Sequence, residues 1–102
     1  MNAVEGKVQE LVEIELAAAN EKHPPFASQH EGYAVIREEI EEAIAPINAL
    51  EEHFGYAWDA IKHDVSAKER VEMCKRFAVW AACELIQVAA MCEKFQKLEG
   101  KK

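Results

Sequence analysis

Residues 71–95, VEMCKRFAVWAACELIQVAAMCEKF, decide the fold class of this chain. Apolar side chains recur there in alternating steps of three and four residues. They are Val71, Cys74, Ala78, Ala81, Leu85, Val88, Cys92 and Phe95. This heptad pattern is typical of a helix packed in a bundle. It predicts one long α-helix, which begins with a capping box at Ser66-Ala67-Lys68-Glu69 and which Gly100 can terminate.

Two further helices are predicted on the N-terminal side of this one. The first runs from about Asn2 to Glu21 on apolar residues at helical spacing, and it ends at His23-Pro24-Pro25 because proline cannot continue a helix. The second begins with a capping box at Ser28-Gln29-His30-Glu31 and runs to about His63. We expect Pro46 to kink it, since proline removes a backbone donor.

The 102 residues make one domain, spanning 1–102, and we predict an all-α bundle of long helices. The last helix carries a second apolar face beside its heptad pattern, formed by Met73, Phe77, Trp80, Met91 and Leu98. A helix that is apolar over so much of its circumference is usually buried on more than one side. In so short a chain the natural cover is another copy, so we expect homo-oligomerisation to a homodimer or homotetramer.

Charge and hydropathy exclude two classes of partner. The net charge of −7 disfavours binding to a nucleic-acid backbone, because acidic surfaces repel phosphates. No window is apolar for long enough to span a membrane, and the glutamate-rich N-terminus does not resemble a signal peptide. We therefore expect a cytoplasmic protein. The acidity suits divalent metal, although it also serves solubility alone.

Cysteine and histidine form no recognisable site in the sequence. The three cysteines are too far apart on one helix to form a disulfide, and we expect them to be buried and slow to react. The histidines show no metal-ligand spacing, so we interpret them as surface or capping residues; they are His23, His30, His53 and His63.

Acidic residues on two helices offer a more specific possibility. Glu39 and Glu42 lie three residues apart on the flank of the second helix's apolar stripe, and Glu84 and Gln87 repeat this spacing on the third helix. Facing pairs of oxygen ligands can hold Mg²⁺ within a bundle. The alternative for Glu84 and Gln87 is a hydrogen bond to another helix, since polar groups on an apolar face need a partner.

The stretches HEGYAVIREEIEE (30–42) and ELIQVAAM (84–91) also resemble small bacterial and phage proteins related to MazG. These belong to the all-α nucleoside triphosphate pyrophosphohydrolase superfamily, whose signature is Glu-Glu-x-x-Glu on one helix and Glu-x-x-Asp on a later one. Glu38, Glu39 and Glu42 match the first part, and Glu84 begins the second. Gln87 stands where the signature has aspartate. The two motifs are also farther apart than usual, with the surplus between about Ile47 and Ser66.

The resemblance implies a MazG-like fold and Mg²⁺-dependent hydrolysis of a nucleoside triphosphate to the monophosphate and pyrophosphate. Glu39, Glu42 and Glu84 would hold the metal with help from Gln87, and Glu38 would orient the attacking water as the catalytic residue. From position we add Lys94 as a phosphate contact and Trp80 as a residue that could stack on a base, although such an aromatic residue is more often core. Two alternatives remain: a non-catalytic helical oligomerisation module, and a protein that binds nucleotide without turnover.

Overall fold

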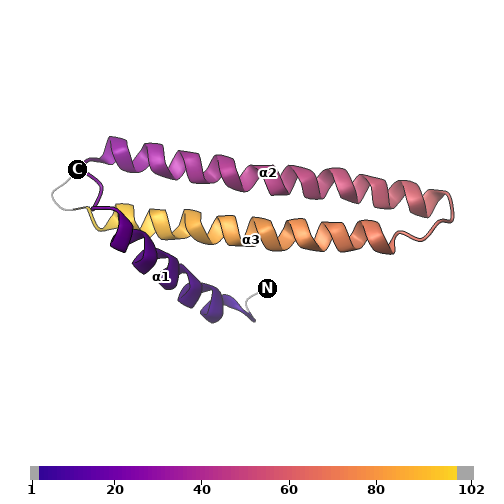
Figure 1. Ribbon diagram of the computed structural model, residues 1–102, viewed down its shortest axis with the longest axis horizontal. Helices are drawn as coiled ribbons and strands as arrows, with labels where there is room; N and C mark the ends of the chain where they lie inside the picture. The colour runs from indigo at the N-terminus through magenta and orange to yellow at the C-terminus, as the bar shows by residue number, and fades with distance from the viewer. Residues whose placement is uncertain (1–2, 99–102) are drawn as a thin grey trace.

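The computed structural model describes residues 3–98 (Figure 1). Its regular structure over this range consists of three α-helices: α1 (Glu5–Lys22), α2 (Gln29–Lys62) and α3 (Lys68–Gln96). The prediction of an all-α chain is confirmed. The predicted helix limits at Asn2 and Gly100 lie outside the described residues, and α3 ends at Gln96. Over residues 3–98, no helix combines the length and the apolar character needed to cross a membrane.

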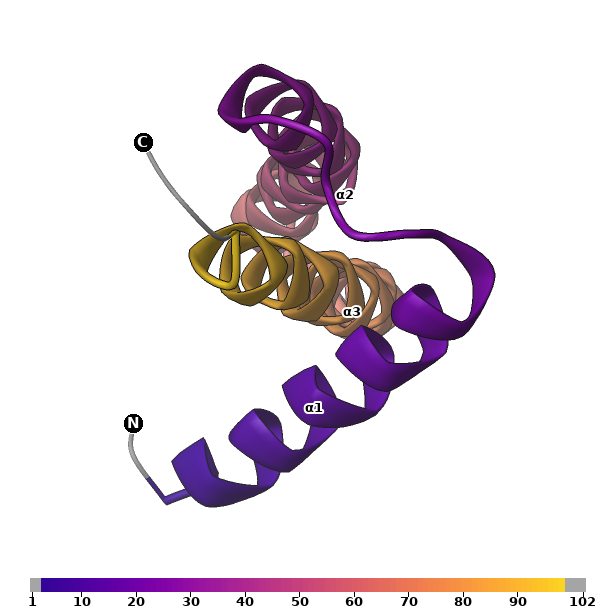
Figure 2. The same ribbon diagram turned by 90° about the vertical axis from the view of Figure 1, so that its left-hand side faces the viewer.

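Helices α2 and α3 form a long antiparallel hairpin, and α1 diverges from it across the C-terminal half of α3 (Figures 1 and 2). Helix α3 is the central element, because both α1 and α2 pack on it. The described arrangement is elongated, with extents of 60 × 27 × 22 Å. In this arrangement, most of the half of the hairpin next to the α2–α3 turn has no third helix packed against it.

The helix starts follow the capping signals only in part. Ser28 Oγ accepts a hydrogen bond of 3.1 Å from the backbone N–H of Glu31, as predicted, while the Glu31 side chain accepts from the N–H of Ala27. The capping box predicted at Ser66 for the start of α3 is not formed. Helix α3 begins at Lys68, and the Ser66 hydroxyl accepts from the N–H of Lys68 instead of capping as predicted.

The end of α2 is fixed by a backbone motif. Asp64 adopts a left-handed conformation, with φ 57°. The N–H of Asp64 donates to the carbonyl of Ile61, and the N–H of Val65 donates to that of Ala60. This pair of bonds is the Schellman arrangement, which satisfies carbonyls that have no partner within the helix. The chain therefore reverses within the five residues 63–67 and returns as α3.

Pro46 lies inside α2 and its side chain is fully buried. Helix α2 is not interrupted by it and continues to Lys62, and the kink at this residue stays a prediction. The ring has no N–H to donate to the carbonyl of Glu42, one turn earlier. Its burial supplies apolar packing at this point of the hairpin.

Small residues bring α2 and α3 close together. Ala43 and Ala57 on α2 are buried, as are Cys74 and Ala81 on α3. The Sγ atom of Cys74 lies 3.9 Å from the carbonyl oxygen of Leu50. A hairpin joined through alanines buries few methylene groups for each turn of helix, so this interface contributes less apolar burial than a leucine-rich one.

Helix α1 is held by a small apolar cluster. Val12 and Leu16 are buried against Ala90, with Ile86 and Met91 packed around them. The other face of α1 is exposed, including Leu11 and Ile14. His23, which follows the helix, is extended before the prolines as the sequence predicts.

The heptad pattern of α3 divides into two rows. Cys74 and Ala81 are buried and Val88 and Phe95 half-buried, whereas the row one turn away is exposed: Val71, Ala78, Leu85 and Cys92. The prediction that the whole pattern is packed is therefore wrong within one chain. The second apolar face is mostly half-buried against the chain's own helices, and only Trp80 on it is exposed.

The prediction that the cysteines are buried holds for one residue of the three. Cys74 is buried in the α2–α3 interface, whereas Cys83 and Cys92 are exposed in the single chain. All three thiols are free. For Cys92 the error arises because the sequence pattern does not distinguish the two rows of the heptad, whereas Cys83 lies outside the heptad pattern.

Candidate metal centre and the adjoining cavity

Three carboxylates from two helices converge in the half of the hairpin that lies away from the α2–α3 turn. Glu39 and Glu42 are one turn apart on α2, and Glu84 faces them from α3. One ligand oxygen from each residue lies within 4.8 Å of the other two. The sequence prediction that these three residues come together is therefore confirmed in the single chain.

Two oxygens of this cluster have no hydrogen-bond partner among residues 3–98. They are Oε1 of Glu39 and Oε1 of Glu84, and both are buried. The other oxygen of Glu84 accepts a hydrogen bond of 3.3 Å from Nε1 of Trp80, one turn earlier on the same helix. The alternative expectation for Glu84, a hydrogen bond to another helix, is not what the described residues show. Buried polar atoms without partners are uncommon in folded proteins and call for an explanation.

The electrostatics of the cluster are unfavourable when no cation is present. Burial and then the neighbouring carboxylates of Glu42 and Glu84 raise the pKa of Glu39, with smaller contributions from Glu38 and Glu15. Arg37 does not offset this charge: its Nε lies 3.5 Å from Oε2 of Glu41, which is exposed and outside the cluster. No ion pair among residues 3–98 involves a carboxylate of the cluster. A bound cation would remove this repulsion.

A cavity of about 480 Å³ adjoins the carboxylate cluster. Its volume is within the range of small-molecule sites. The walls come from the end of α1, the α1–α2 connection, and the facing parts of α2 and α3. The polar lining residues are Glu15, Lys22, His23, Glu31, Glu38, Glu39, Gln87 and Lys94. The lining thus carries both charges, with four carboxylates and two lysines.

Lys94 is the most deeply buried charged residue described, with 7% of its surface exposed. Its Nζ lies 4.9 Å from the centroid of the Phe26 ring, in a cation–π contact. No ion pair to a carboxylate is present for it among residues 3–98. A buried ammonium group that faces a cavity and lacks a counter-ion favours an anionic ligand.

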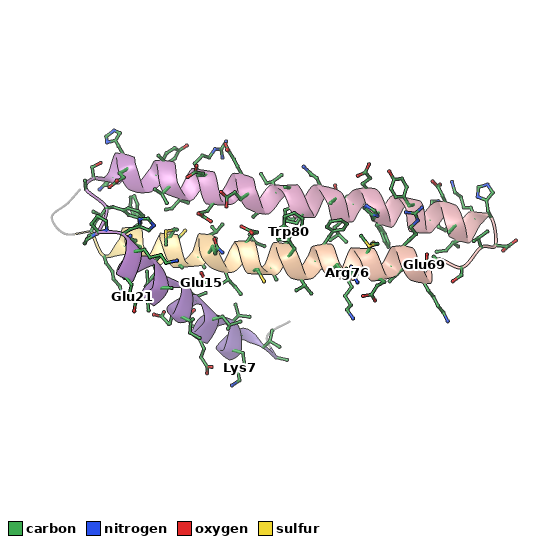
Figure 3. The ribbon with its side chains drawn as sticks, viewed as in Figure 1. Lys7, Glu15, Glu21, Glu69, Arg76 and Trp80 are labelled. Atoms are coloured by element: carbon green, nitrogen blue, oxygen red, sulfur yellow. The ribbon has the colours of Figure 1, made fainter. Side chains whose placement is uncertain are left out.

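The remaining predicted residues divide between the cavity and its surroundings. Glu38 is exposed and Gln87 is half-buried, and both line the cavity. Trp80 is outside the cavity lining, and its side chain lies between the ribbons of α3 and α2 (Figure 3). Its contacts are the hydrogen bond to Glu84 and a tilted ring contact with Phe77.

Sequence reasoning missed the part of the cavity that α1 and its connection supply. Lys22, His23 and Phe26 line it, together with Glu15 on α1, which Figure 3 shows near the crossing with α3. No motif marks these residues. Their only sequence signal is the proline pair that ends α1 beside them.

The prediction that all four histidines are surface or capping residues is wrong for one of them. His53 is half-buried, packs against the rings of Tyr56 and Phe77, and has a buried Nδ1 without a partner among residues 3–98. His23 and His63 occupy the caps that end α1 and α2. His53 lies in the hairpin beyond Trp80 and does not line the cavity.

Comparison with known proteins gives no match: no family model, no curated protein and no solved structure is significantly similar to this chain.

Proposed function

We propose that this chain is a Mg²⁺-dependent nucleoside triphosphate pyrophosphohydrolase with a MazG-like bundle. The observation that carries the proposal is the convergence of Glu39, Glu42 and Glu84 next to a cavity that contains a buried lysine. A cation-binding centre beside an anion-binding group is the arrangement that a magnesium triphosphate requires.

The donor set fits a hard divalent cation. All three side chains offer carboxylate oxygens, and two of those oxygens are buried without partners among the described residues. Glu39, Glu42 and Glu84 would hold Mg²⁺, and Gln87 would add a neutral oxygen from the cavity wall. When bound, Mg²⁺ neutralises phosphate charge and makes a coordinated water more acidic.

The cavity suits the rest of the substrate. In the proposed reaction the bond between the α- and β-phosphates breaks, and a water oxygen bonds to the α-phosphorus. The Lys94 ammonium binds phosphate oxygens, and Lys22 adds a second positive charge at the α1 wall. The Glu38 carboxylate, on the cavity wall beside Glu39, orients the water and accepts its proton.

Trp80 has a different role in this proposal from the one predicted. Because it donates to Glu84 and is not part of the cavity lining, it orients a metal ligand rather than stacking on the base. Hydrogen bonds of this kind fix the direction of ligand side chains and support metal affinity.

One observation favours a second candidate, nucleotide binding without turnover. The residue three positions after Glu84 is the neutral Gln87, so the site carries one negative charge fewer than the family signature supplies. Weaker charge on the ligands reduces metal affinity while leaving the cavity and its lysines unchanged.

A panel of ribo- and deoxyribonucleoside triphosphates, incubated with millimolar Mg²⁺ and scored for pyrophosphate and monophosphate, tests the proposal. We expect pyrophosphate release that chelation abolishes. Glu39→Gln should remove it, while Glu41→Gln, an exposed carboxylate on the same helix, should retain it. Mg²⁺-dependent nucleotide binding without release would support the second candidate. The absence of both would overturn the proposal and favour the helical oligomerisation module.

A further inference from the structure

A second cavity adjoins the first at the end of the hairpin that lies away from the α2–α3 turn. Its volume is about 330 Å³, at the lower end of the range for small-molecule sites. Its lining consists of Asn20, His23, Pro25, Phe26, Lys94, Lys97 and Leu98. The C-terminal ends of α1 and α3 and the α1–α2 connection therefore form its walls (Figures 1 and 2). We call it the lysine cavity.

The polar lining of the lysine cavity differs from that of the larger cavity beside the carboxylate cluster. Its polar side chains can all donate hydrogen bonds; they are Asn20, His23, Lys94 and Lys97. No carboxylate is among the described residues that line it, although acidic residues outnumber lysine and arginine by 19 to 12 in the chain. The larger cavity, in contrast, has four carboxylates in its lining. A concave surface that bears one sign of charge concentrates ions of the other sign, so the lysine cavity favours an anion.

The burial of Lys94 points to a ligand independently of this lining. Only 7% of its surface is exposed, and its Nζ lies 4.9 Å from the centroid of the Phe26 ring, with no ion pair to a carboxylate among residues 3–98. An ammonium group has three N–H donors, and the face of a phenyl ring offers it no hydrogen-bond acceptor of ordinary strength. Because a buried charge without a counter-ion costs free energy, a bound anion would stabilise this side chain.

The two cavities share a wall that contains Phe26. This ring is buried and lines both cavities, as do His23 and Lys94. The ring also packs closely against α2, because a Cβ at Gly32 would lie 3.1 Å from Cδ2 of Phe26. The Lys94 ammonium thus belongs to one cavity that has carboxylates and to one that has none. The cavity without carboxylates is the better place for an anion that needs no metal.

Lys97 completes the cationic part of the lining. Its Nζ lies 3.6 Å from Oε2 of Glu93, and 64% of the lysine side chain is exposed. Exposed ion pairs of this kind are weak, so the ammonium can turn to a stronger anionic partner. Lysines in the last turn of a helix also offset the negative end of the helix dipole. That role accounts for charge at the end of α3, but it requires neither a cavity nor the burial of Lys94.

We propose that the lysine cavity binds a phosphate group, either as free phosphate or as the end of a small organic phosphate. Lys94 and Lys97 donate to phosphate oxygens from the end of α3. Asn20 and His23 donate from the end of α1. Donors that reach an anion from several directions suit a tetrahedral phosphate, with its larger charge and additional oxygens, better than a planar carboxylate.

The rest of the lining is apolar and consists of Pro25, Phe26 and Leu98. An organic group attached to the phosphate can pack against these side chains. The carboxylates of Glu39, Glu42 and Glu84 do not line this cavity. The proposal therefore goes beyond the proposed hydrolysis and does not depend on it.

Binding is measured by nuclear magnetic resonance on the metal-free full chain, without nucleotide. Inorganic phosphate, phenyl phosphate and acetate are titrated separately, and the side-chain amide of Asn20 reports binding because Asn20 lines only the lysine cavity. Both phosphates should shift this resonance at lower concentration than acetate does. Tighter binding of phenyl phosphate would support the organic form of the ligand, and equal binding of the two would support free phosphate. No shift with either phosphate, or acetate binding as tight as phosphate binding, would overturn the proposal.

A matched pair of lysine variants locates the anion. Lys97 lines only the lysine cavity and Lys22 only the larger one, and both are exposed at the end of a helix. Lys97→Gln should weaken phosphate binding by about tenfold, which corresponds to the loss of one hydrogen bond from a charged group. Lys22→Gln makes the same change in net charge and should bind phosphate nearly as the wild type does. An equal or greater loss in Lys22→Gln would place the anion in the larger cavity and overturn the proposal.

A third variant tests the buried lysine. Lys94→Met keeps an apolar stem of similar length and removes the ammonium, so it should abolish phosphate binding. If Lys94→Met fails to fold, the comparison of Lys97→Gln with Lys22→Gln still decides. A Lys94→Met protein that folds and binds phosphate as tightly as the wild type would overturn the proposal.

Discussion

Trp80 and Glu84 lie one turn apart on α3, and Nε1 of Trp80 donates a hydrogen bond of 3.3 Å to Oε2 of Glu84. The other oxygen of Glu84 is buried next to Glu39 and Glu42. The indole thus holds one side of a carboxylate whose other side faces the proposed metal centre. This contact links the aromatic residues of the hairpin to the acidic cluster.

The first prediction concerns this hydrogen bond. Trp80→Phe keeps an aromatic ring next to Phe77 but removes the donor, so Glu84 loses the group that orients it. Mg²⁺ affinity, measured by isothermal titration calorimetry, should fall by about 10-fold or more, as for other groups that orient metal ligands. The control is Trp58→Phe, whose ring contacts Lys62 and not the cluster. Equal affinities for the two variants would contradict the role of Trp80.

The second prediction concerns a close contact within the hairpin. A Cβ at Gly32 would lie 2.5 Å from Cδ2 of Phe95, whereas a Cβ at Gly55 would meet nothing within 4 Å. Gly32→Ala should lower the free energy of unfolding by about 1–3 kcal/mol through overpacking. Gly55→Ala should raise it by about 0.5–1 kcal/mol, because alanine loses less entropy in a helix. Urea unfolding monitored by circular dichroism measures both changes.

The sign of the Gly55→Ala effect serves as the control. If both variants are stabilised, Phe95 can move away at little cost and the contact does not limit the packing. If both are destabilised, the change at residue 32 cannot be attributed to Phe95.

The helices and the carboxylate cluster could be predicted from sequence for one physical reason: both follow from helical periodicity. Residues three apart share a helix face, so the sequence alone pairs Glu39 with Glu42, and the same periodicity directs Glu84 toward them. The Schellman motif at Asp64 and the displaced start of α3 depend on backbone conformation at single residues. The pattern of apolar residues does not encode those conformations.

Two features of the structure, the cavity and the exposure of one row of α3, could not be predicted from sequence for a different reason. The cavity depends on where α1 crosses α3, and that crossing is set by Val12 and Leu16 against Ala90, a long-range contact without a periodic signature. The exposure of Leu85 depends on which of two equally apolar rows meets α2. Periodicity specifies that a helix has an apolar stripe, but not which flank of the stripe a short chain leaves open.

The third prediction follows from the raised pKa of Glu39. Its ordinary pKa is 4.5, and burial with neighbouring carboxylates raises it in the folded state. Below pH 4.5 the group is protonated in both states; above the raised pKa it is ionised in both, and the folded state bears the full penalty. Without metal, its contribution to stability should therefore fall as the pH rises between these two values.

Chemical unfolding in the presence of a chelator, repeated across this pH window, measures the effect. Glu39→Gln should remove the decrease, because glutamine does not ionise. Glu41→Gln, which changes an exposed carboxylate, should preserve it. A wild-type profile that rises with pH in the same way as that of Glu39→Gln would contradict the assigned direction.

The fourth prediction concerns the neutral residue on the cavity wall. Gln87→Asp adds a carboxylate to the cavity wall that Glu39 also lines, and supplies the charge that the proposed family's signature has at this position. It should tighten Mg²⁺ binding and lower the stability of the metal-free protein, because a further negative charge joins the cluster. Gln96→Asp, at an exposed position of the same helix, controls for the change in net charge. Calorimetric titration with Mg²⁺ that shows no gain for Gln87→Asp over Gln96→Asp would remove Gln87 from the proposed ligand set.

The last prediction separates a metal-binding role of Glu84 from a structural one. If Glu39, Glu42 and Glu84 repel one another, Glu84→Gln should leave the metal-free protein as stable as the wild type or more stable. Millimolar Mg²⁺ should raise the thermal midpoint of the wild type, because a ligand that binds only the folded state stabilises it, and the variant should lose this increase. Glu72→Gln, at an exposed position of α3, should respond to Mg²⁺ like the wild type. A structural role instead predicts that Glu84→Gln lowers the midpoint equally with and without Mg²⁺, because it disturbs the bond from Trp80. A wild-type midpoint that Mg²⁺ does not change would rule out the metal centre itself.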